Sequence, residues 1–208
     1  MKTSTAKKVG GIPHGKRRLI EATLRLSARG TSISSLGLRE LAREAQLNHN
    51  TFYRHFRDLD DLGLAAAEEV AGQVMAGMKE VRRNAATHAD ATVGAAEYFL
   101  DFVRDNPQPF IVGLREAHSA NSPMREVMKK VFDEIAAESV EQITSMNLAP
   151  GLDRKMLLKA TSAIAYYMFY RSLDYIEHPR RRSAIVDEIV SFARMQFFGA
   201  AALKGRNL

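Results

Sequence analysis

The segment Asn48–Asp58, with the sequence NHNTFYRHFRD, brings together polar side chains that can form paired hydrogen bonds. In a helix that turns about 100° per residue, Asn50 and Arg54 lie on one side, opposite Phe52 and Phe56. The amide of an asparagine can form two hydrogen bonds to adenine in the major groove of DNA, and the guanidinium of an arginine two to guanine. The chemistry that suits this spacing is therefore hydrogen bonding to the edges of bases.

Catalytic and metal-binding patterns are missing from the sequence. The six histidines are scattered, there is no cysteine, and no glycine-rich phosphate loop occurs. A carboxylate-bridged di-iron bundle needs two Glu-x-x-His pairs, whereas Glu116 and His118 are two residues apart and lie on different helix faces. We expect neither an enzyme nor a metal site. The lack of cysteine excludes disulfides and fits a reducing compartment.

Positive charge is concentrated in the N-terminal quarter of the chain. Residues 1–57 contain twelve Lys and Arg against three Glu, a balance of +9, while the rest carries −3, which gives the total of +6. Such an asymmetry is typical of a protein that meets a polyanion at one end. A solvated basic surface with a disordered tail would give the same count.

The pattern along the chain predicts helices and no strands. No stretch alternates convincingly between apolar and polar residues, and no Asn-Gly or Asp-Gly hairpin turn occurs. We expect an all-α protein of about nine helices, separated by segments that carry Gly, Pro, Asn or Ser. The expected helices are Lys16–Arg29, Leu38–Ala45, His49–Phe56, Leu59–Arg83, Ala91–Asn106, Phe110–Ser119, Met124–Met146, Arg154–Glu177 and Ser183–Leu203.

The composition is that of a soluble globular protein, with 46% hydrophobic and 26% charged residues. The densest apolar run, AIAYYMFY, ends at Arg171 and is far shorter than the ~18 residues that span a membrane. The first eighteen residues are charged and lack the apolar core of a secretory signal. We expect a cytoplasmic protein without a membrane partner.

The first three helices are expected to pack around one small core. Leu41 and Ala42 give the second helix an apolar side, and Gly37 is its expected N-cap, with Glu40 at N3 as half of a capping box. Asn48 is the expected N-cap of the third helix. Three short helices with a polar side on the last describe a helix-turn-helix whose recognition helix is exposed.

The segment LRELAREAQLNHNTFYRHFRDLDDLGL resembles the DNA-binding domain of the TetR family of bacterial repressors. The family pattern of Ile/Leu-Ala, Ala-Gly-Val and Tyr-x-His-Phe is met at Leu41-Ala42, Ala45-Gln46-Leu47 and Tyr53-Arg54-His55-Phe56. The resemblance covers roughly Lys16–Leu64. It implies a flexible basic arm at residues 1–15, a helix-turn-helix DNA-binding domain at 16–58, and a ligand-binding and dimerisation domain at 59–208.

The resemblance also implies which side chains contact a palindromic double-stranded operator. Tyr53 would contact a backbone phosphate, and His55 would lie against the core of its own domain or the DNA backbone. Lys7, Lys8 and Arg18 would extend the contact as part of a basic arm, if the arm is ordered. The expected DNA-binding residues are Lys16, Arg17, Gly37, Arg39, Asn48, His49, Asn50, Thr51, Tyr53, Arg54, His55 and Arg57.

Three positions depart from the family pattern. Gln46 stands where the family usually has Gly, in a turn that tends to need a positive φ, at a cost of ~1 kcal/mol or more for a residue with a side chain. Gly37 replaces a Ser or Thr that would cap the helix and touch a phosphate. Leu59 replaces a Lys that often contacts phosphate, and Arg57 could compensate for it.

Two further segments, HFRDLDDLGL and NPQPFIVGLRE, resemble the TetR-family subgroup that represses genes of unsaturated fatty-acid synthesis and desaturation. Members of that subgroup sense long-chain acyl-CoA, so the resemblance implies such an effector and no required cofactor. The alternative is a TetR-like repressor of efflux or catabolic genes that responds to another hydrophobic or aromatic small molecule.

The C-terminal part is expected to hold the effector pocket and the dimer interface. The last two helices are apolar almost all round, so a partner's matching pair is expected to cover them in a homodimer. Arg115, Lys129, Lys130 and Arg180–Arg182 are candidates for binding a CoA phosphate. The expected pocket residues are Phe99, Phe102, Val103, Phe110, Leu114, Phe132, Tyr166, Tyr167 and Tyr170.

Overall fold

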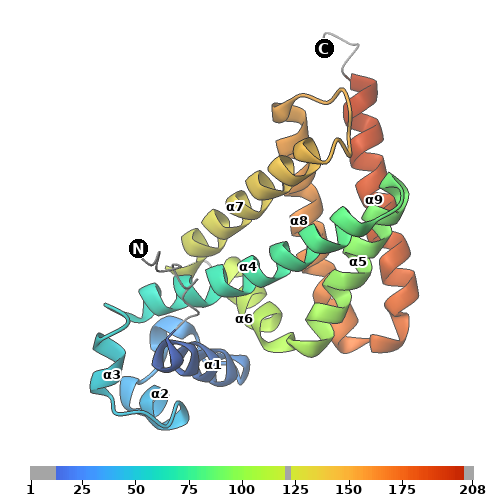
Figure 1. Ribbon diagram of the computed structural model, residues 1–208. Helices are drawn as coiled ribbons and strands as arrows, with labels where there is room; N and C mark the ends of the chain where they lie inside the picture. Colours follow the sequence, from blue (N-terminus) through green and yellow to red (C-terminus); the bar gives the residue numbers. More distant parts are fainter. Residues whose placement is uncertain (1–12, 120–122, 204–208) are drawn as a thin grey trace, which may run out of the picture.

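The computed structural model describes residues 13–119 and 123–203, and the described residues contain helices and no strand (Figure 1). The prediction of an all-α fold with nine α-helices is confirmed for this part of the chain. The elements are α1 (His14–Ala28), η1 (Ile33–Ser35), α2 (Leu38–Glu44), α3 (Asn50–Tyr53), α4 (Leu59–Asn84), α5 (His88–Asp105), α6 (Pro107–His118), α7 (Met124–Ser145), α8 (Arg154–Glu177), η2 (Pro179–Arg181) and α9 (Arg182–Leu203).

Helices α1–α3 form an N-terminal unit around one hydrophobic cluster, which includes the buried Leu19, Leu41, Phe52 and Phe56. Helix α3 is one turn long, shorter than the expected span to residue 56. Helical hydrogen bonding still continues past it, since Phe56 N donates to Phe52 O at 2.9 Å. A helix this short is unstable alone in water, so the burial of its two phenylalanines holds it in place.

Helix α4 belongs to both halves of the molecule. Its N-cap is Asp58, whose Oδ1 accepts a hydrogen bond from Asp61 N at 2.8 Å. Its 26 residues extend for about 39 Å at a rise of about 1.5 Å each. Leu62 packs in the N-terminal cluster, and Val74 and Met78 pack in the C-terminal core. The helix therefore connects the two cores as one rigid element (Figure 1).

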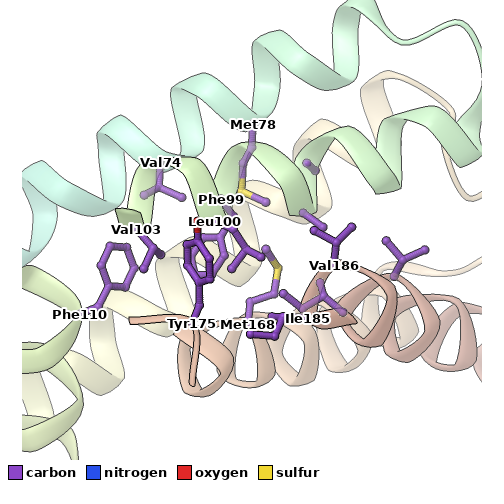
Figure 2. Packing of buried hydrophobic residues seen from close by; sticks show 14 of the residues in the cluster. Val74, Met78, Phe99, Leu100, Val103, Phe110, Met168, Tyr175, Ile185 and Val186 are labelled. Carbon is purple, nitrogen blue, oxygen red and sulfur yellow. The ribbon is translucent and has the colours of Figure 1, made fainter. Parts of the chain in front are cut away.

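The C-terminal body consists of α5–α9 packed beside the second half of α4. Its core joins residues from α4, α5, α6, α8 and α9, among them Val74, Phe99, Phe110, Tyr175 and Ile185 (Figure 2). The rings of Phe99 and Phe110 meet edge to face with centroids 5.5 Å apart, a favourable geometry for aromatic pairs. No helix of the described residues is long and apolar enough to cross a membrane.

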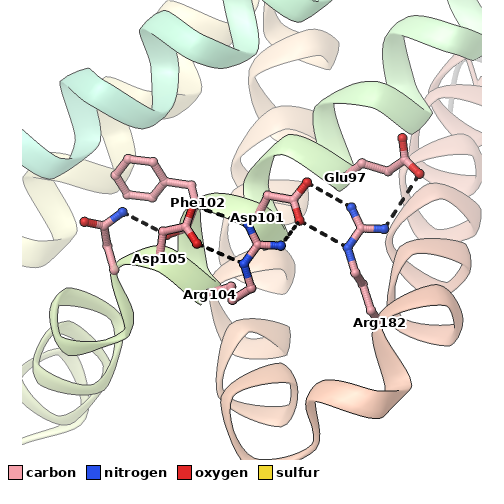
Figure 3. Close-up of polar contacts among 7 residues, drawn as sticks. Glu97, Asp101, Phe102, Arg104, Asp105 and Arg182 are labelled. Atoms are coloured by element: carbon pink, nitrogen blue, oxygen red, sulfur yellow. Dashed lines mark hydrogen bonds and ion pairs between the residues drawn. The ribbon is translucent and has the colours of Figure 1, made fainter.

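Ion pairs connect the start of α9 to α5. Arg182 Nη2 lies 3.0 Å from Asp101 Oδ2, and its Nη1 lies 3.9 Å from Glu97 Oε1 (Figure 3). Arg104 pairs with Asp101 at 3.0 Å and with Asp105 at 2.9 Å. These side chains are partly exposed, so each pair contributes at most about 1 kcal/mol.

Candidate nucleic-acid interface and ligand cavity

Helix α3 lies at the edge of the molecule (Figure 1), and its polar side is exposed. Asn50 and Arg54 are exposed, and Tyr53 is 62% exposed while its ring edge packs on Phe52 at a centroid distance of 5.3 Å. Asn48 is exposed, and its Oδ1 accepts a hydrogen bond from the Asn50 N–H at 2.9 Å. The base-facing side chains predicted on this helix are thus accessible.

The N-cap prediction for α3 was one residue too early. The residue at the N-cap is His49, which has helical backbone angles and makes no side-chain cap. Asn48 nevertheless performs the capping chemistry through its bond to the Asn50 N–H, because the preceding turn places its amide over the end of the helix. For α2 the prediction is confirmed, since Gly37 is the N-cap.

The other predicted DNA-binding residues differ in their exposure to solvent. Arg17, Gly37, Arg39, His49 and Arg57 are exposed, whereas Lys16, Thr51 and His55 are half-buried. Lys16 Nζ lies 5.5 Å from the centroid of the Phe56 ring, within the range of a cation–π contact. Residues 1–12, with Lys7 and Lys8 of the expected arm, lie outside the described residues.

His55 lies against α1 of its own unit. A Cβ added to Gly15 would stand 3.0 Å from His55 Nε2 and 3.5 Å from Thr51 Cγ2. A side chain at position 15 would therefore push α1 away from the end of α3, and the glycine permits their close approach. Of the two positions that the family resemblance implied for His55, the structure places it at the protein side.

The turn between α2 and α3 has the positive φ that was predicted at Gln46, where the family pattern usually has glycine. Gln46 has a φ of +52°, in the left-handed region that favours glycine. Leu47 N donates to Ala42 O at 2.8 Å and Gln46 N to Arg43 O at 3.0 Å, the two bonds of a Schellman motif. Arg18 Nη2 donates to Gln46 Oε1 at 2.8 Å, so this arginine is engaged within the unit.

An elongated cavity of about 230 Å³ follows α4 through the body of the molecule. Its lining residues on α4 recur every three or four positions, so they form one stripe along a single side of the helix. They are Gly63, Ala66, Ala67, Val70, Ala71, Val74, Met75, Met78 and Arg82. Residues of α5–α9 complete the lining, and Leu24 of α1 and Ile33 of η1 close the end beside the N-terminal unit.

Of the predicted pocket residues, Phe99, Phe110 and Phe132 line this cavity. Six do not, which corrects the predicted lining: Phe102, Val103, Leu114, Tyr166, Tyr167 and Tyr170. Tyr166 and Tyr170 are exposed on the outer side of α8, because a turn of about 100° per residue points them away from the flanking Ala165 and Phe169, which do line it. Tyr167 instead stacks on Phe192 of α9, with centroids 4.2 Å apart.

The predicted pocket residues were mostly aromatic and did not include the small residues of α4. Ala66 and Ala67 are small and line the cavity. Gly63 lets the side chain of Met124 approach the helix, since a Cβ on Gly63 would stand 2.5 Å from Met124 Sδ. The spacing of these small residues, three and four positions, is visible in the sequence. It marks a cavity only when another helix fails to fill the space, which tertiary packing decides.

Two charged side chains, Arg82 and Glu116, line the mainly apolar cavity at opposite ends. Arg82 donates from Nη1 to Gln142 Oε1 at 2.6 Å. Burial lowers the pKa of Arg82 to about 10, and the Glu138 carboxylate opposes this shift, so the guanidinium is charged at pH 7. Glu116, only 1% exposed, accepts from Ile33 N at Oε1 and from Ser32 Oγ at Oε2, both at 3.2 Å.

The end of α6 joins the C-terminal body to the N-terminal unit through hydrogen bonds beside the cavity. Arg115 Nη1 donates to Ser27 O at 2.8 Å and its Nη2 to Thr31 O at 2.9 Å. Glu116, the next residue, both lines the cavity and binds η1. Arg115 is thus occupied in a structural contact, which removes it from the candidates for a CoA phosphate.

The remaining phosphate candidates are exposed or already paired. Arg182 and Arg181 have acidic partners in Asp101 and Glu188, and Lys130 Nζ lies 3.6 Å from Glu134. Lys129 on α7 and Arg180 in η2 are exposed. None of these five residues lines the cavity.

No protein-family model matches the chain, whereas solved structures share its fold. FadR from Bacillus subtilis in complex with stearoyl-CoA aligns over 88% of this chain and 98% of its own, at 18% identity and a TM-score of 0.65. The fatty acid degradation regulator FadR from Bacillus halodurans aligns over 93% and 98%, at 14% identity and a TM-score of 0.69. A TetR-family transcriptional regulator from Streptomyces coelicolor aligns over 93% and 84%, at 18% identity and a TM-score of 0.68. The chain therefore has the fold of transcriptional regulators that include the TetR family.

Proposed function

We propose that this chain is a TetR-family transcriptional regulator that binds operator DNA as a homodimer and responds to a small hydrophobic effector. The observation that carries the proposal is the exposure of Asn50 and Arg54 on α3, in a segment whose charge balance is +9. In this proposal residues 16–58 bind DNA, residues 1–15 form a basic arm, and residues 59–208 bind the effector and the partner.

In this proposal, different side chains recognise the bases and bind the phosphates. Asn50 and Arg54 have the amide and the guanidinium that form paired hydrogen bonds to adenine and guanine. Tyr53, Arg17 and Arg39 are exposed around them and suit phosphate contacts, which position the protein without specifying sequence. The positive charge of this unit provides the salt-dependent part of the affinity.

An exposed apolar surface on α8 and α9 supports the homodimer. Large hydrophobic side chains are exposed there, with Phe198 at 73% and Tyr170 at 59%. The others on these helices are Leu158, Tyr166, Met195 and Leu203. Clusters of this kind are typical of protein interfaces, and a second copy would offer the same two helices in return.

The shape of the cavity favours a long-chain acyl effector, such as an acyl-CoA, over a bulky aromatic molecule. A volume of about 230 Å³ spread along several turns of α4 suits a thin flexible chain. FadR from Bacillus subtilis, which has this fold, is described in complex with stearoyl-CoA. Control of unsaturated fatty-acid or desaturase genes rests on the two sequence motifs alone.

The experiment is a selection of DNA sequences from a random pool by the purified protein, followed by affinity measurements on the selected site. We expect a palindrome, because two copies present two α3 helices. Asn50→Ala and Arg54→Ala should each reduce discrimination at one base position by about 1–3 kcal/mol.

Lys155→Ala is the matched control, since Lys155 is exposed at the start of α8, in the C-terminal body. It should leave both affinity and sequence preference unchanged. Selection that yields no preferred sequence, or Asn50 and Arg54 variants that bind like the control, would overturn the proposal.

A further inference from the structure

We propose that the cavity holds a linear acyl chain in one orientation, with its oxygen-bearing head at Arg82 and its methyl end at Gly63 and Ile33. The shared chemistry of the ligand is a straight hydrocarbon chain that ends in a carboxylate or a thioester carbonyl. The inference deepens the proposed function, on which it rests for the identity of the site. It adds a direction to the ligand and a reason for chain-length selection.

The length of the cavity fits such a chain. Gly63 and Arg82 are nineteen residues apart on one straight helix, a distance of about 29 Å at about 1.5 Å per residue. A zigzag chain of carbon–carbon bonds of ~1.5 Å extends by roughly 1.25 Å per methylene. A chain of sixteen to eighteen carbons therefore spans roughly 20–22 Å, and the head group and the arginine side chain occupy the rest.

The two ends of the cavity differ in their access to solvent. His88 is the one exposed residue among those that line the cavity, and it starts α5 just after the end of α4 that carries Arg82. At the opposite end Ile33, Gly63 and Glu116 are all buried. Among the described residues, the exposed position that lines the cavity therefore lies at the end of Arg82 and His88, where a large polar head has access to solvent.

The charges of the two ends agree with this direction. The guanidinium of Arg82 has five N–H donors, of which the bond to Gln142 uses one, and the described residues provide no other hydrogen-bond acceptor to the guanidinium. The Glu138 carboxylate lies close enough to influence Arg82 and would compete with a ligand for it. At the opposite end Glu116 is buried and its Oε1 lies 3.4 Å from Arg115 Nη2, so the cation nearest that end already has an acidic partner.

The methyl end of a long chain would lie against the DNA-binding half of the molecule. Ile33 and Leu24 line that end of the cavity and belong to η1 and α1 of the N-terminal unit. Glu116 at the same end holds Ile33 N and Ser32 Oγ. A chain that stops short of this region would bind without touching the N-terminal unit, so chain length selects the ligands that can affect it.

The first test measures the head group by calorimetric titration of the full-length protein with stearate, stearoyl-CoA and stearyl alcohol, below their critical micelle concentrations. Arg82→Gln should weaken the binding of stearate or stearoyl-CoA by on the order of tenfold to a hundredfold, the effect of a lost charged hydrogen bond. Neutral stearyl alcohol should be unaffected. Arg83→Gln is the control, since Arg83 is exposed and pairs with Glu80.

The second test measures the direction by comparing stearate with laurate. Ala67→Leu fills the end of the cavity beside the N-terminal unit, so it should weaken stearate about tenfold and leave the shorter laurate unchanged. Retained laurate binding also shows that the variant is folded. Ala76→Leu is the control, because Ala76 is exposed on the same helix and does not line the cavity.

The outcomes separate this inference from the proposed function. Equal effects of Arg82→Gln and Arg83→Gln, equal effects of Ala67→Leu on both chain lengths, or no chain binding at all would overturn the inference. None of these measurements contains DNA, so a protein that fails to select an operator can still support the inference. If Arg82→Gln weakens the binding of stearate alone, the natural ligand is a free fatty acid. If it weakens the binding of stearoyl-CoA, the natural ligand is an acyl thioester.

Discussion

At the scale of single residues, Gln46 shows a sequence departure that the surrounding structure accommodates. It occupies the C′ position of a Schellman motif, where glycine is preferred because a Cβ is strained at positive φ. Its side chain accepts a hydrogen bond from Arg18, which connects this turn to α1. The contact offsets part of the backbone cost that a residue with a side chain incurs there.

Two substitutions at this position separate the backbone cost from the hydrogen bond. Gln46→Ala and Gln46→Gly both remove the contact with Arg18, but only the glycine variant relieves the strain at a φ of +52°. We expect the glycine variant to have the higher free energy of unfolding, by about 1 kcal/mol. Chemical denaturation followed by circular dichroism measures the difference. Equal stabilities, or a more stable alanine variant, would show that the turn is not strained.

At the scale of elements, the end of α6 is the connection between the cavity and the N-terminal unit. Arg115 holds the carbonyl oxygens at the end of α1, and Glu116 holds η1. The long helix α4 makes a second connection through Leu62 and Val74. A ligand in the cavity can therefore change the orientation of α3 through either connection. In both cases the ligand must bind one arrangement of the molecule more tightly than the other.

Removing Arg115 tests the connection through α6. Arg115→Ala should lower the free energy of unfolding by about 1–3 kcal/mol, because two carbonyl groups lose a charged donor. It should also reduce the change in operator affinity that an acyl ligand produces, while calorimetric binding of the ligand persists. The control is Arg104→Ala, since the ion pairs of Arg104 among the described residues are with Asp101 and Asp105 of its own helix (Figure 3). It should change stability by less than about 1 kcal/mol.

At the scale of the whole molecule, the hydrophobic surface of α8 and α9 is the feature that a single chain leaves unexplained. The inner sides of both helices are buried, as at Met168 and Ile189, while Tyr170, Met195 and Phe198 face outward. A helix that is apolar nearly all round needs cover on more than one side. One chain covers only the inner side.

A charge on this surface should separate the proposed dimer. Phe198→Glu would replace the most exposed of these aromatic side chains by a carboxylate and weaken self-association by on the order of 2–4 kcal/mol, the cost of losing an aromatic anchor. Sedimentation velocity of the full chain measures the oligomeric state, and affinity for the palindrome should fall with it. Lys129→Glu, a charge change at an exposed site on α7, is the control. A Phe198→Glu protein that associates like the wild type would exclude this surface as the interface.

Much of the N-terminal unit was predictable because its determinants are local. The spacing of Phe52 and Phe56, the cap at Gly37 and the strained turn at Gln46 depend on residues a few positions apart, and the structure agrees with each. The length of α3 was overestimated, since its last residues keep helical hydrogen bonds without forming a regular helix. Of the aromatic residues expected in the pocket, some line the cavity, as Phe99 does, and others lie exposed outside it, as Tyr170 does.

The sequence by itself determined the helical class, the concentration of positive charge at one end and the exposed polar side of the third helix, because periodicity, composition and caps act over short distances. Only the tertiary structure decided where the cavity lies, since its lining combines small residues of α4 with residues from helices that are remote in sequence. The positions of Arg82 and Glu116 at its two ends were decided in the same way. A void is the space that packing leaves unfilled, and no local pattern specifies what a distant helix fails to fill.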